Sequence, residues 1–261
     1  MASEVSPQAI LTGKVAIVTG GGSGLGEATA RVFAQAGAAV ALTGRRADKL
    51  AETARKIETA GGRALVLPCD MARPDAVRGM IDEAARQGGG LDMLVNNAGR
   101  HAQFVPTAEV TLADFDDYVA INLRGPFVAI QSALPHMLAR GGGAIVNIAS
   151  MAGLVGLKYA SSYCAVKGGL IQLTRAVAVE VADKNIRVNC VCPGGMEPTE
   201  SRRQMSPEEL IRVGEAIQGG SPAGRPADVF AVARFLLTLV DPAMGGLTGA
   251  IIPFDGGYTA R

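Results

Sequence analysis

Short apolar runs alternate with longer segments of helical periodicity along the whole chain of 261 residues. The apolar runs predict strands at residues 15–19, 39–43, 64–67, 93–95, 144–149, 186–191 and 250–253. Helical periodicity covers residues 25–36, 47–60, 74–87, 111–139, 162–183 and 226–240. Strands joined by crossover helices run parallel, because each helix returns the chain to the same end of the sheet. The pattern therefore predicts one α/β domain over residues 1–261, a doubly wound Rossmann-type fold whose seven-stranded parallel sheet has helices on both faces.

The composition argues against several classes of protein. Basic and acidic residues number 25 and 24, so no positive surface for nucleic acid is expected. No window reaches 18 uninterrupted apolar residues, which predicts no membrane span, and the amino-terminal stretch does not look like a signal peptide. The 4 cysteines form no CxxC pair and the 2 histidines are far apart, so we expect no metal site, reduced thiols and a cytoplasmic location.

The first predicted strand runs directly into a glycine-rich loop that precedes a helix. Strand, glycine loop and helix in this order are typical of a pyrophosphate site, where free N–H groups of the helix bind the phosphates. The spacing is T-G-x-x-x-G-x-G rather than G-x-G-x-x-G, and an ordinary turn is the alternative. The position after the first strand favours phosphate binding. The residues expected there are Gly20, Gly24, Leu25 and Gly26.

The end of the second strand bears on the choice of cofactor. A carboxylate there would bind the ribose 2′-hydroxyl of NAD, whereas an arginine would accommodate the 2′-phosphate of NADP. No acid occupies the tip of this strand, and Arg45, which follows it, can fork onto a phosphate. Asp48 is the rival, but its position fits the first turn of the next helix. The sequence therefore favours NADP(H) over NAD(H).

Ser150, Tyr163 and Lys167 form a candidate catalytic group. Tyr163 and Lys167 stand four residues apart in a predicted helix and so share one face, although chance could produce such a pair. Ser150 closes an apolar strand, at the carboxyl edge where doubly wound sheets place their ligands. We therefore expect the three side chains to lie together.

In these motifs and their order the sequence resembles the short-chain dehydrogenase/reductase family over nearly the whole chain. The matching motifs are the loop from Thr19 to Gly26, Asp70, Asn96-Asn97-Ala98-Gly99, Asn122, Ser150, Tyr163-x-x-x-Lys167 and Pro193-Gly194. The resemblance implies an NAD(P)-dependent oxidoreductase that transfers a hydride between a nicotinamide cofactor and a ketone or secondary alcohol.

The resemblance also implies the catalytic roles. Tyr163 would be the general acid/base, with its pKa, ordinarily about 10, lowered by Lys167 and by the cationic nicotinamide. Lys167 would hydrogen-bond the nicotinamide ribose, and Ser150 would hydrogen-bond the reacting oxygen of the substrate. Asn122 would hold a water that links Lys167 to solvent, and its place amid helix-forming sequence predicts a local kink.

Further residues would contact the cofactor, on the same resemblance. Asp70 would lie at the adenine edge, although a helix cap also explains it. Asn97, Ala98 and Gly99 would lie along the adenosine with Asn96, and an ordinary turn is their alternative. Pro193 and Gly194 would border the nicotinamide. Thr199 would reach its carboxamide or the phosphates, but four residues separate it from Gly194, more than is usual in the family.

The substrate pocket is expected between residues 151–157, the loop after Gly99 and a substrate loop at about 194–220 with a short helix from Ser206. Apolar residues there, namely Met151, Leu154, Val155 and Leu157, predict a ketone or secondary alcohol on a small or medium apolar skeleton. Arg100, His101 and Glu197 are the polar candidates, with solvated loop residues as the alternative.

Other functions stay open. A 3-oxoacyl-thioester reductase acting on an acyl-carrier protein would need basic docking residues, but by alignment those positions hold Val128 and Val179. A non-catalytic NADP-binding regulator is opposed by retention of the four catalytic residues, and length and glycine spacing disfavour a dehydratase or epimerase. Members of the family commonly pair two long helices between subunits, so the resemblance implies a homotetramer. Small residues in these helices, such as Gly168 and Gly169, fit that pairing, but burial within one chain would explain them as well.

Overall fold

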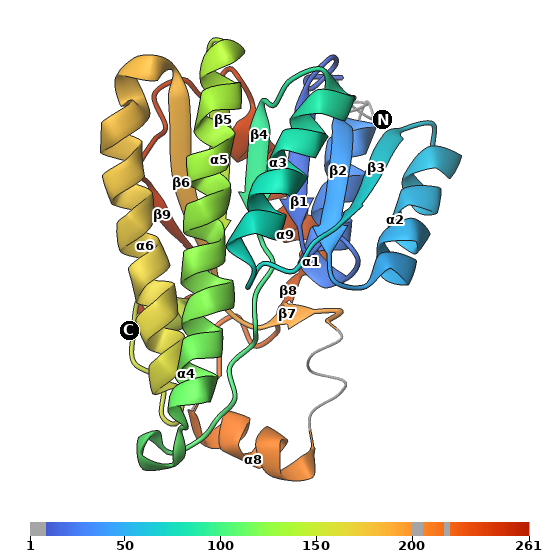
Figure 1. Cartoon of the computed structure of the whole chain (residues 1–261). Coiled ribbons are helices and arrows are strands. Elements are labelled where there is room, and N and C mark those ends of the chain that lie inside the picture. The colour runs from blue at the N-terminus through green and yellow to red at the C-terminus, as the bar shows by residue number, and fades with distance from the viewer. Residues whose placement is uncertain (1–8, 200–205, 217–219, 261) are drawn as a thin grey trace.

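The computed structural model describes residues 9–199, 206–216 and 220–260 and contains one parallel seven-stranded sheet (Figure 1). The strand order is β3-β2-β1-β4-β5-β6-β9. The strands are β1 Val15–Thr19, β2 Ala39–Gly44, β3 Arg63–Pro68, β4 Met93–Asn96, β5 Gly143–Ile148, β6 Ile186–Pro193 and β9 Ile251–Phe254. The predicted seven strands and the doubly wound fold are confirmed.

Two layers of helices cover the sheet. They are α1 Gly24–Gln35, α2 Ala47–Thr59, α3 Pro74–Gly88, α4 Leu112–Val119, α5 Gly125–Ala139, α6 Ser161–Val181 and α9 Val229–Val240. One core lies between the sheet and α1, α2 and α9, and the other between the sheet and α3, α5 and α6. Figure 1 views the molecule through α3, α5 and α6, with α1 and α9 behind the sheet.

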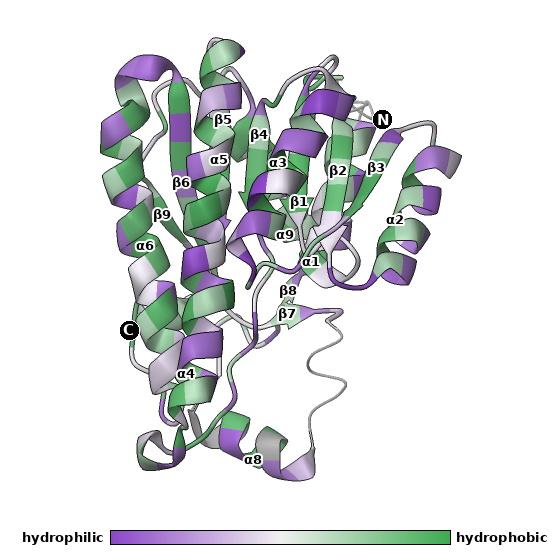
Figure 2. Ribbon diagram, viewed as in Figure 1, coloured by the Kyte–Doolittle hydropathy of each residue, from purple (hydrophilic) through white to green (hydrophobic). Residues whose placement is uncertain are grey.

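The strands are apolar on both faces because both faces are covered. In β1, Val18 contributes to the core under α1 and α9, whereas its neighbour Ile17 contributes to the core under α3, α5 and α6. Figure 2 shows this as strands that are mostly hydrophobic in the centre, while the outer helices alternate between hydrophobic and hydrophilic residues. Alternate side chains therefore fill opposite cores, which is why the sequence shows unbroken apolar runs.

The predicted long helix over residues 111–139 is interrupted at Asn122. It consists of α4, a π-helical turn at Ala120–Arg124 and α5. Thr111 caps α4 by accepting the Asp114 N–H through its hydroxyl at 3.1 Å. A local kink was predicted at Asn122; the structure has a π-helical turn there, in which the asparagine is buried.

The segment after β6 carries structure that the sequence did not indicate. A two-residue strand, β7 Met196–Glu197, pairs in parallel with β8 Ala227–Asp228. The helix predicted from Ser206 is observed as α8 Pro207–Ala216. Both lie beyond the carboxyl ends of the sheet strands, the β7–β8 pair just below the sheet and α8 at the lower edge in Figure 1. Within the described residues, no helix combines the length and the hydropathy that crossing a bilayer requires.

Candidate active site

Ser150, Tyr163 and Lys167 meet beyond the carboxyl end of β5. Ser150 lies two residues after the end of β5 and caps a short 3₁₀ helix, Met151–Gly153, its hydroxyl accepting the Ala152 N–H at 3.2 Å. Tyr163 and Lys167 lie in the first two turns of α6, and the Lys167 ammonium is 5.6 Å from the centroid of the Tyr163 ring. The Ser150 side chain lies close enough to the Tyr163 hydroxyl to lower the pKa of that phenol. The three predicted residues are therefore together.

Burial sets the protonation of this group. Loss of water raises the pKa of Tyr163 to about 12, and the nearby Ser150 side chain acts in the opposite direction. Burial lowers the pKa of Lys167 to about 8, partly offset by the thiols of Cys190 and Cys192. The Lys167 ammonium donates to the Ile148 carbonyl oxygen at 2.8 Å, which fixes its position below the tyrosine. Without cofactor, Tyr163 therefore holds its proton at neutral pH.

Asn122 faces the same group from the π-helical turn. Its side chain is 1 % exposed, and its Nδ2 donates to the Tyr118 carbonyl oxygen at 3.3 Å. Its Oδ1 has no hydrogen-bond partner among the described residues. A Cβ on Gly99 would come within 2.7 Å of this Oδ1 and 3.7 Å of Lys167 Nζ. Asn122, Gly99 and Lys167 are thus neighbours, and glycine at position 99 keeps the acceptor uncovered.

Thr19 joins the glycine-rich loop to the loop after β4. Its hydroxyl accepts the backbone N–H groups of Asn97 at 2.9 Å and Ala98 at 2.8 Å, and donates to the Val95 carbonyl oxygen at 3.3 Å. The Asn97 side chain returns a hydrogen bond to the Thr19 carbonyl oxygen at 2.8 Å. Two of the segments predicted to contact cofactor are therefore tied together at the switch between β1 and β4, where the strand order reverses.

The glycine loop leaves backbone uncovered where α1 begins. Gly20 and Gly24 have φ of +70° and +53°, values that favour glycine. A side chain on Gly26 would overlap the carbonyl oxygen of Gly20. Leu25 is buried and anchors the first turn of α1 in the core. The loop is therefore held close to the helix, with its amide groups at the helix N-terminus.

The remaining predicted cofactor residues lie on the same edge of the sheet. Arg45 follows β2, is exposed, and has no hydrogen bond or ion pair with any described residue. Asp70 accepts the Ala72 N–H through Oδ1 at 3.0 Å, as a turn residue before α3. Pro193 ends β6, and the Gly194 N–H donates to the Phe254 carbonyl oxygen at 3.1 Å. Thr199 is partly buried, with its hydroxyl 3.5 Å from the Met196 carbonyl oxygen.

Tyr118 is a neighbour of the site that the sequence did not reveal. Its ring lies edge-on to that of Tyr163, with the centroids 6.2 Å apart. Its hydroxyl donates to the His101 carbonyl oxygen at 2.8 Å and accepts the Gln103 N–H at 2.7 Å. Nothing in the local pattern marks Tyr118, apart from its place one helical turn before Asn122.

Arg100, a predicted polar candidate for binding substrate, binds other residues of the protein instead. Its guanidinium forms an ion pair with Asp114 at 2.7 Å, donates to the Gln103 side chain at 2.8 Å, and lies 4.7 Å above the Tyr118 ring. Arg100 therefore braces the loop after β4 against α4.

Apolar side chains adjoin the candidate catalytic group on the side where the sequence predicts the substrate pocket. Phe104, Met151 and Leu157 are buried in one cluster, against which Tyr163 and Val213 of α8 pack. Of the other predicted lining residues, Leu154 packs on a neighbouring cluster, while Val155 is exposed. The helix predicted from Ser206 thus contributes to the same wall as the residues after Ser150.

Three comparisons with known proteins bear on this site. A family model described as short chain dehydrogenase matches residues 14–210. The chain belongs to this family. The cis-4-hydroxycyclohexanecarboxylate dehydrogenase of Sinomonas cyclohexanicum is 39% identical to this short-chain dehydrogenase, over 95% of this chain and 97% of its own. The D-beta-hydroxybutyrate dehydrogenase of Rhizobium meliloti is 37% identical, over 95% and 99%.

Solved structures agree with the fold of this dehydrogenase. A short-chain type dehydrogenase/reductase from Mycobacterium marinum superimposes with a TM-score of 0.89 at 36% identity, over 98% of each chain. The chain is therefore an oxidoreductase acting on alcohol or ketone groups with a nicotinamide cofactor. Its described residues suit that cofactor, because the Gly20–Gly26 loop offers helix N–H groups for a pyrophosphate and the Asn122 Oδ1 acceptor lies beside Lys167.

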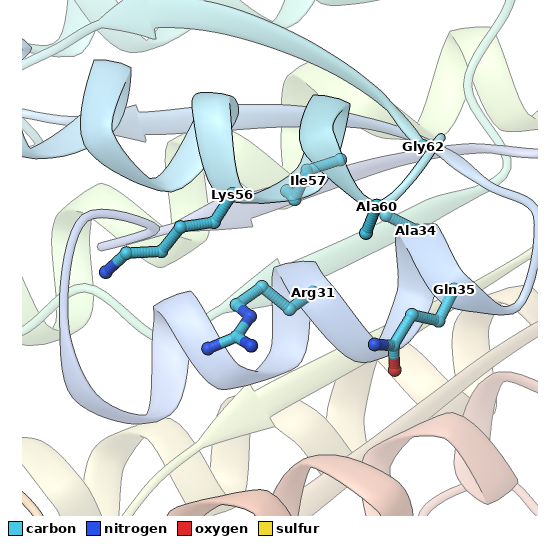
Figure 3. A pocket seen from close by; sticks show the side chains of 7 residues that line it. All are labelled: Arg31, Ala34, Gln35, Lys56, Ile57, Ala60 and Gly62. Atoms are coloured by element: carbon cyan, nitrogen blue, oxygen red, sulfur yellow. The ribbon is translucent and has the colours of Figure 1, made fainter.

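A separate hollow of about 30 Å³ lies between α1 and α2 of the dehydrogenase (Figure 3). Arg31 and Lys56 line it, but both face Glu27, at 3.7 and 2.9 Å. None of the predicted site residues lines this hollow. Because Glu27 already pairs with both cations, the hollow has no free positive charge to bind an anionic ligand.

Proposed function

We propose that this dehydrogenase interconverts a ketone and a secondary alcohol, with Tyr163 exchanging a proton with the reacting oxygen. The observation that carries the proposal is the meeting of the Ser150 and Tyr163 side chains beside the buried Lys167 ammonium. A substrate oxygen placed between the two hydroxyls would accept from both, so Ser150 would position it and Tyr163 would transfer the proton. The nicotinamide cofactor supplies or removes the hydride.

The two directions make different demands on Tyr163. Ketone reduction needs a proton donor, and a phenol whose pKa is about 12 holds its proton at neutral pH. Alcohol oxidation needs a base, and lowering that pKa to near 7 takes roughly 7 kcal/mol. The Lys167 ammonium and the cationic oxidised nicotinamide would provide this together. Lys167 would also hydrogen-bond the nicotinamide ribose, and Asn122 Oδ1 would hold the water that passes protons from Lys167 to solvent.

The same proposal assigns the cofactor contacts. Gly20, Gly24, Leu25 and Gly26 would surround the pyrophosphate. Asp70 would lie at the adenine, the loop residues Asn97, Ala98 and Gly99 along the adenosine, and Pro193, Gly194 and Thr199 at the nicotinamide. Support comes from their placement along one edge of the sheet, across the switch between β1 and β4.

We also propose that NADP(H) is preferred to NAD(H). Arg45 is exposed at the end of β2 without a described partner, and Asp48 lies in the first turn of α2, as a helix-start carboxylate should. A guanidinium there suits the 2′-phosphate. The test is kcat/KM with each cofactor, for the wild type and Arg45→Ala. A higher value with NAD for the wild type would overturn the preference.

The substrate would carry its carbonyl on an apolar skeleton. The wall of Phe104, Met151 and Leu157 supports this, as do the alicyclic and short-chain hydroxy acids named for the two relatives. Segment 194–220 would act as the substrate loop; its residues 200–205 and 217–219 lie outside the described residues. A panel of ketones and alcohols followed by nicotinamide absorbance tests the function, with Tyr163→Phe as the control. Turnover of none of them by the wild type would favour a non-catalytic, cofactor-binding role.

Surface residues support a homotetramer rather than an acyl-carrier partner. Val128 is buried at 5 % exposure and so cannot be part of a docking face, and Val179 is apolar at 83 % exposure. Leu112 and Phe115 of α4 and Phe127 and Leu138 of α5 are further exposed apolar side chains. Gly169, by contrast, packs against Leu123 of the same chain. Sedimentation velocity tests the assembly, and a monomer at micromolar concentration would overturn it. The four free cysteines support a reducing compartment such as the cytoplasm.

A further inference from the structure

A cavity of about 140 Å³ lies at the amino ends of the central strands, on the edge of the sheet opposite the candidate active site. Its polar lining residues come from the starts of β1, β4 and β6 and from the turn after α5. They are Lys14, Asp92, Arg140, Asn185 and Arg187, and glycines and apolar residues make up the remainder. None of the residues predicted for catalysis or for the cofactor lines this cavity. It is therefore separate from the site described above.

The lining of the cavity carries more positive than negative charge. Its three cations are Lys14, Arg140 and Arg187, and its one carboxylate is Asp92. The Asp92 carboxylate pairs with Lys14 and with Arg140, both at 3.1 Å, and has no ion pair with Arg187. One carboxylate cannot balance three cations, so the lining side chains have an excess of two positive charges.

Arg187 is the buried cation of this group, with 7 % of the residue exposed. Its guanidinium donates to the carbonyl oxygens of Leu239 at 2.7 Å and Asp241 at 3.0 Å, at the carboxyl end of α9. Carbonyl groups at a helix end supply only part of a negative charge. Burial lowers the pKa of Arg187, and the Asp241 carboxylate, which forms no ion pair with it, opposes this only in part. A buried cation without a full counter-charge favours the binding of an anion.

Lys14 and Arg140 keep N–H groups available at the opening of the cavity, where their side chains are 39 % and 34 % exposed. The Lys14 ammonium makes one hydrogen bond, to Asp92, and Nη1 of Arg140 makes none to any described residue. Glycine at position 90 admits the arginine, because a Cβ on Gly90 would come within 2.5 Å of Arg140 Cδ. Two charged donors are thus held side by side by one carboxylate, with N–H groups to spare for an oxyanion.

We propose that this cavity binds a phosphate group, either inorganic phosphate or the phosphate of a small phosphomonoester. A phosphate carries nearly two negative charges at neutral pH, which matches the excess charge of the lining. A cavity of about 150 Å³ can hold benzene, so this one has room for a phosphate. Lys14 and Arg140 donate to the phosphate oxygens, and Arg187 adds positive charge from the interior.

Isothermal titration calorimetry of inorganic phosphate into the cofactor-saturated enzyme tests the proposal. Saturation with oxidised nicotinamide cofactor keeps phosphate out of the Gly20–Gly26 loop, and ionic strength is held constant. The wild type should bind one phosphate per chain. Arg140→Gln and Lys14→Gln should each weaken binding roughly ten- to hundredfold, the loss of one hydrogen bond between charged groups. Either variant leaves Asp92 with one cationic partner, so the fold should persist.

The matched control is Lys56→Gln, in the hollow between α1 and α2. The Lys56 side chain is 40 % exposed, as Lys14 is, but it pairs with both Glu27 and Glu52. Removing a lysine whose charge is already balanced should leave the affinity for phosphate unchanged. Equal weakening by Lys56→Gln and Lys14→Gln would show that general surface charge, rather than this cavity, attracts the anion, and would overturn the proposal.

Two further ligands identify what the cavity binds. Glycerol 1-phosphate binding more tightly than inorganic phosphate indicates a phosphomonoester, and the reverse order indicates free phosphate; either supports the proposal. Acetate, which carries a single charge, should bind at least tenfold more weakly than phosphate. No binding at millimolar phosphate, an affinity for acetate equal to that for phosphate, or binding that neither Arg140→Gln nor Lys14→Gln weakens would overturn it.

Discussion

Replacing Lys167 by methionine should stabilise the protein while abolishing catalysis. Lys167 is 4 % exposed, and burial lowers its pKa from 10.5 to about 8. That difference corresponds to about 3 kcal/mol by which the folded state disfavours the ammonium. Methionine keeps an unbranched apolar stem of similar length and removes the charge. The lost hydrogen bond to the Ile148 carbonyl oxygen costs about 1 kcal/mol, so the net gain near pH 7 should be about 2 kcal/mol.

The dependence on pH identifies the cause. The folded-state pKa is depressed, so between pH 8 and 10.5 the unfolded chain keeps a proton that the folded chain has lost. The stability of the wild type therefore rises through this window by about 1.4 kcal/mol per pH unit, relative to Lys167→Met. The advantage of the variant should shrink above pH 8 and reverse before pH 10.5. Other titrating groups are common to both proteins and cancel in the difference.

Urea denaturation without cofactor measures this difference. Because the chain has no tryptophan, circular dichroism should report unfolding, with protein concentration held constant between pH 7 and pH 10. The matched control is Lys184→Met: this lysine is exposed and pairs with Asp183 at the surface, so its removal should give no trend with pH. If the wild type is the more stable protein at pH 7, or the gap to Lys167→Met stays constant across the range, the reasoning about burial is wrong.

Three further predictions concern the site. Tyr163→Phe should abolish turnover while cofactor still binds, as followed by nicotinamide absorbance and by cofactor titration; substantial residual activity would remove Tyr163 as the acid/base. With the wild type and saturating cofactor, kcat for alcohol oxidation should rise with pH while kcat for ketone reduction should stay nearly constant around neutral pH, because burial raises the pKa of the Tyr163 phenol to about 12 and only oxidation needs the phenolate; parallel profiles would contradict this. Thr19→Val should lower the free energy of unfolding by about 1–3 kcal/mol and weaken cofactor binding, because two partly buried N–H groups lose their acceptor; the control Thr29→Val loses only a bond within α1, and an equal effect of both would refute the bridging role.

The sequence predicted the sheet because strand and helix periodicity are local properties. β1 and β2 were predicted to within a residue of their observed ends, since unbroken apolar runs bounded by glycine leave few alternatives. The helix from Ser206 was predicted from its cap pattern alone. The β7–β8 pair was missed, because two-residue strands about 30 positions apart carry no periodicity.

The candidate site divides in the same way. Ser150, Tyr163 and Lys167 could be selected because strand ends and helix spacing place them at one edge. Tyr118 could not, because its role depends on a ring contact across two helices. Arg100 was predicted as a polar candidate for binding substrate, but its guanidinium forms an ion pair with Asp114 and stabilises the loop after β4. No local sequence pattern distinguishes an arginine that pairs within the protein from one that is available to a ligand.

The sequence by itself determined the order of strands and helices, the glycine loop and the residue types that the chemistry requires. Only the tertiary structure decided their protonation and their neighbours. Lys167 and Tyr163 would titrate near 10 in an open chain. Packing α6 over the end of β5 removes water from both and moves their pKa values in opposite directions, down for the lysine and up for the tyrosine. Hydration is lost only when distant segments meet, so no local pattern of residues can encode that result.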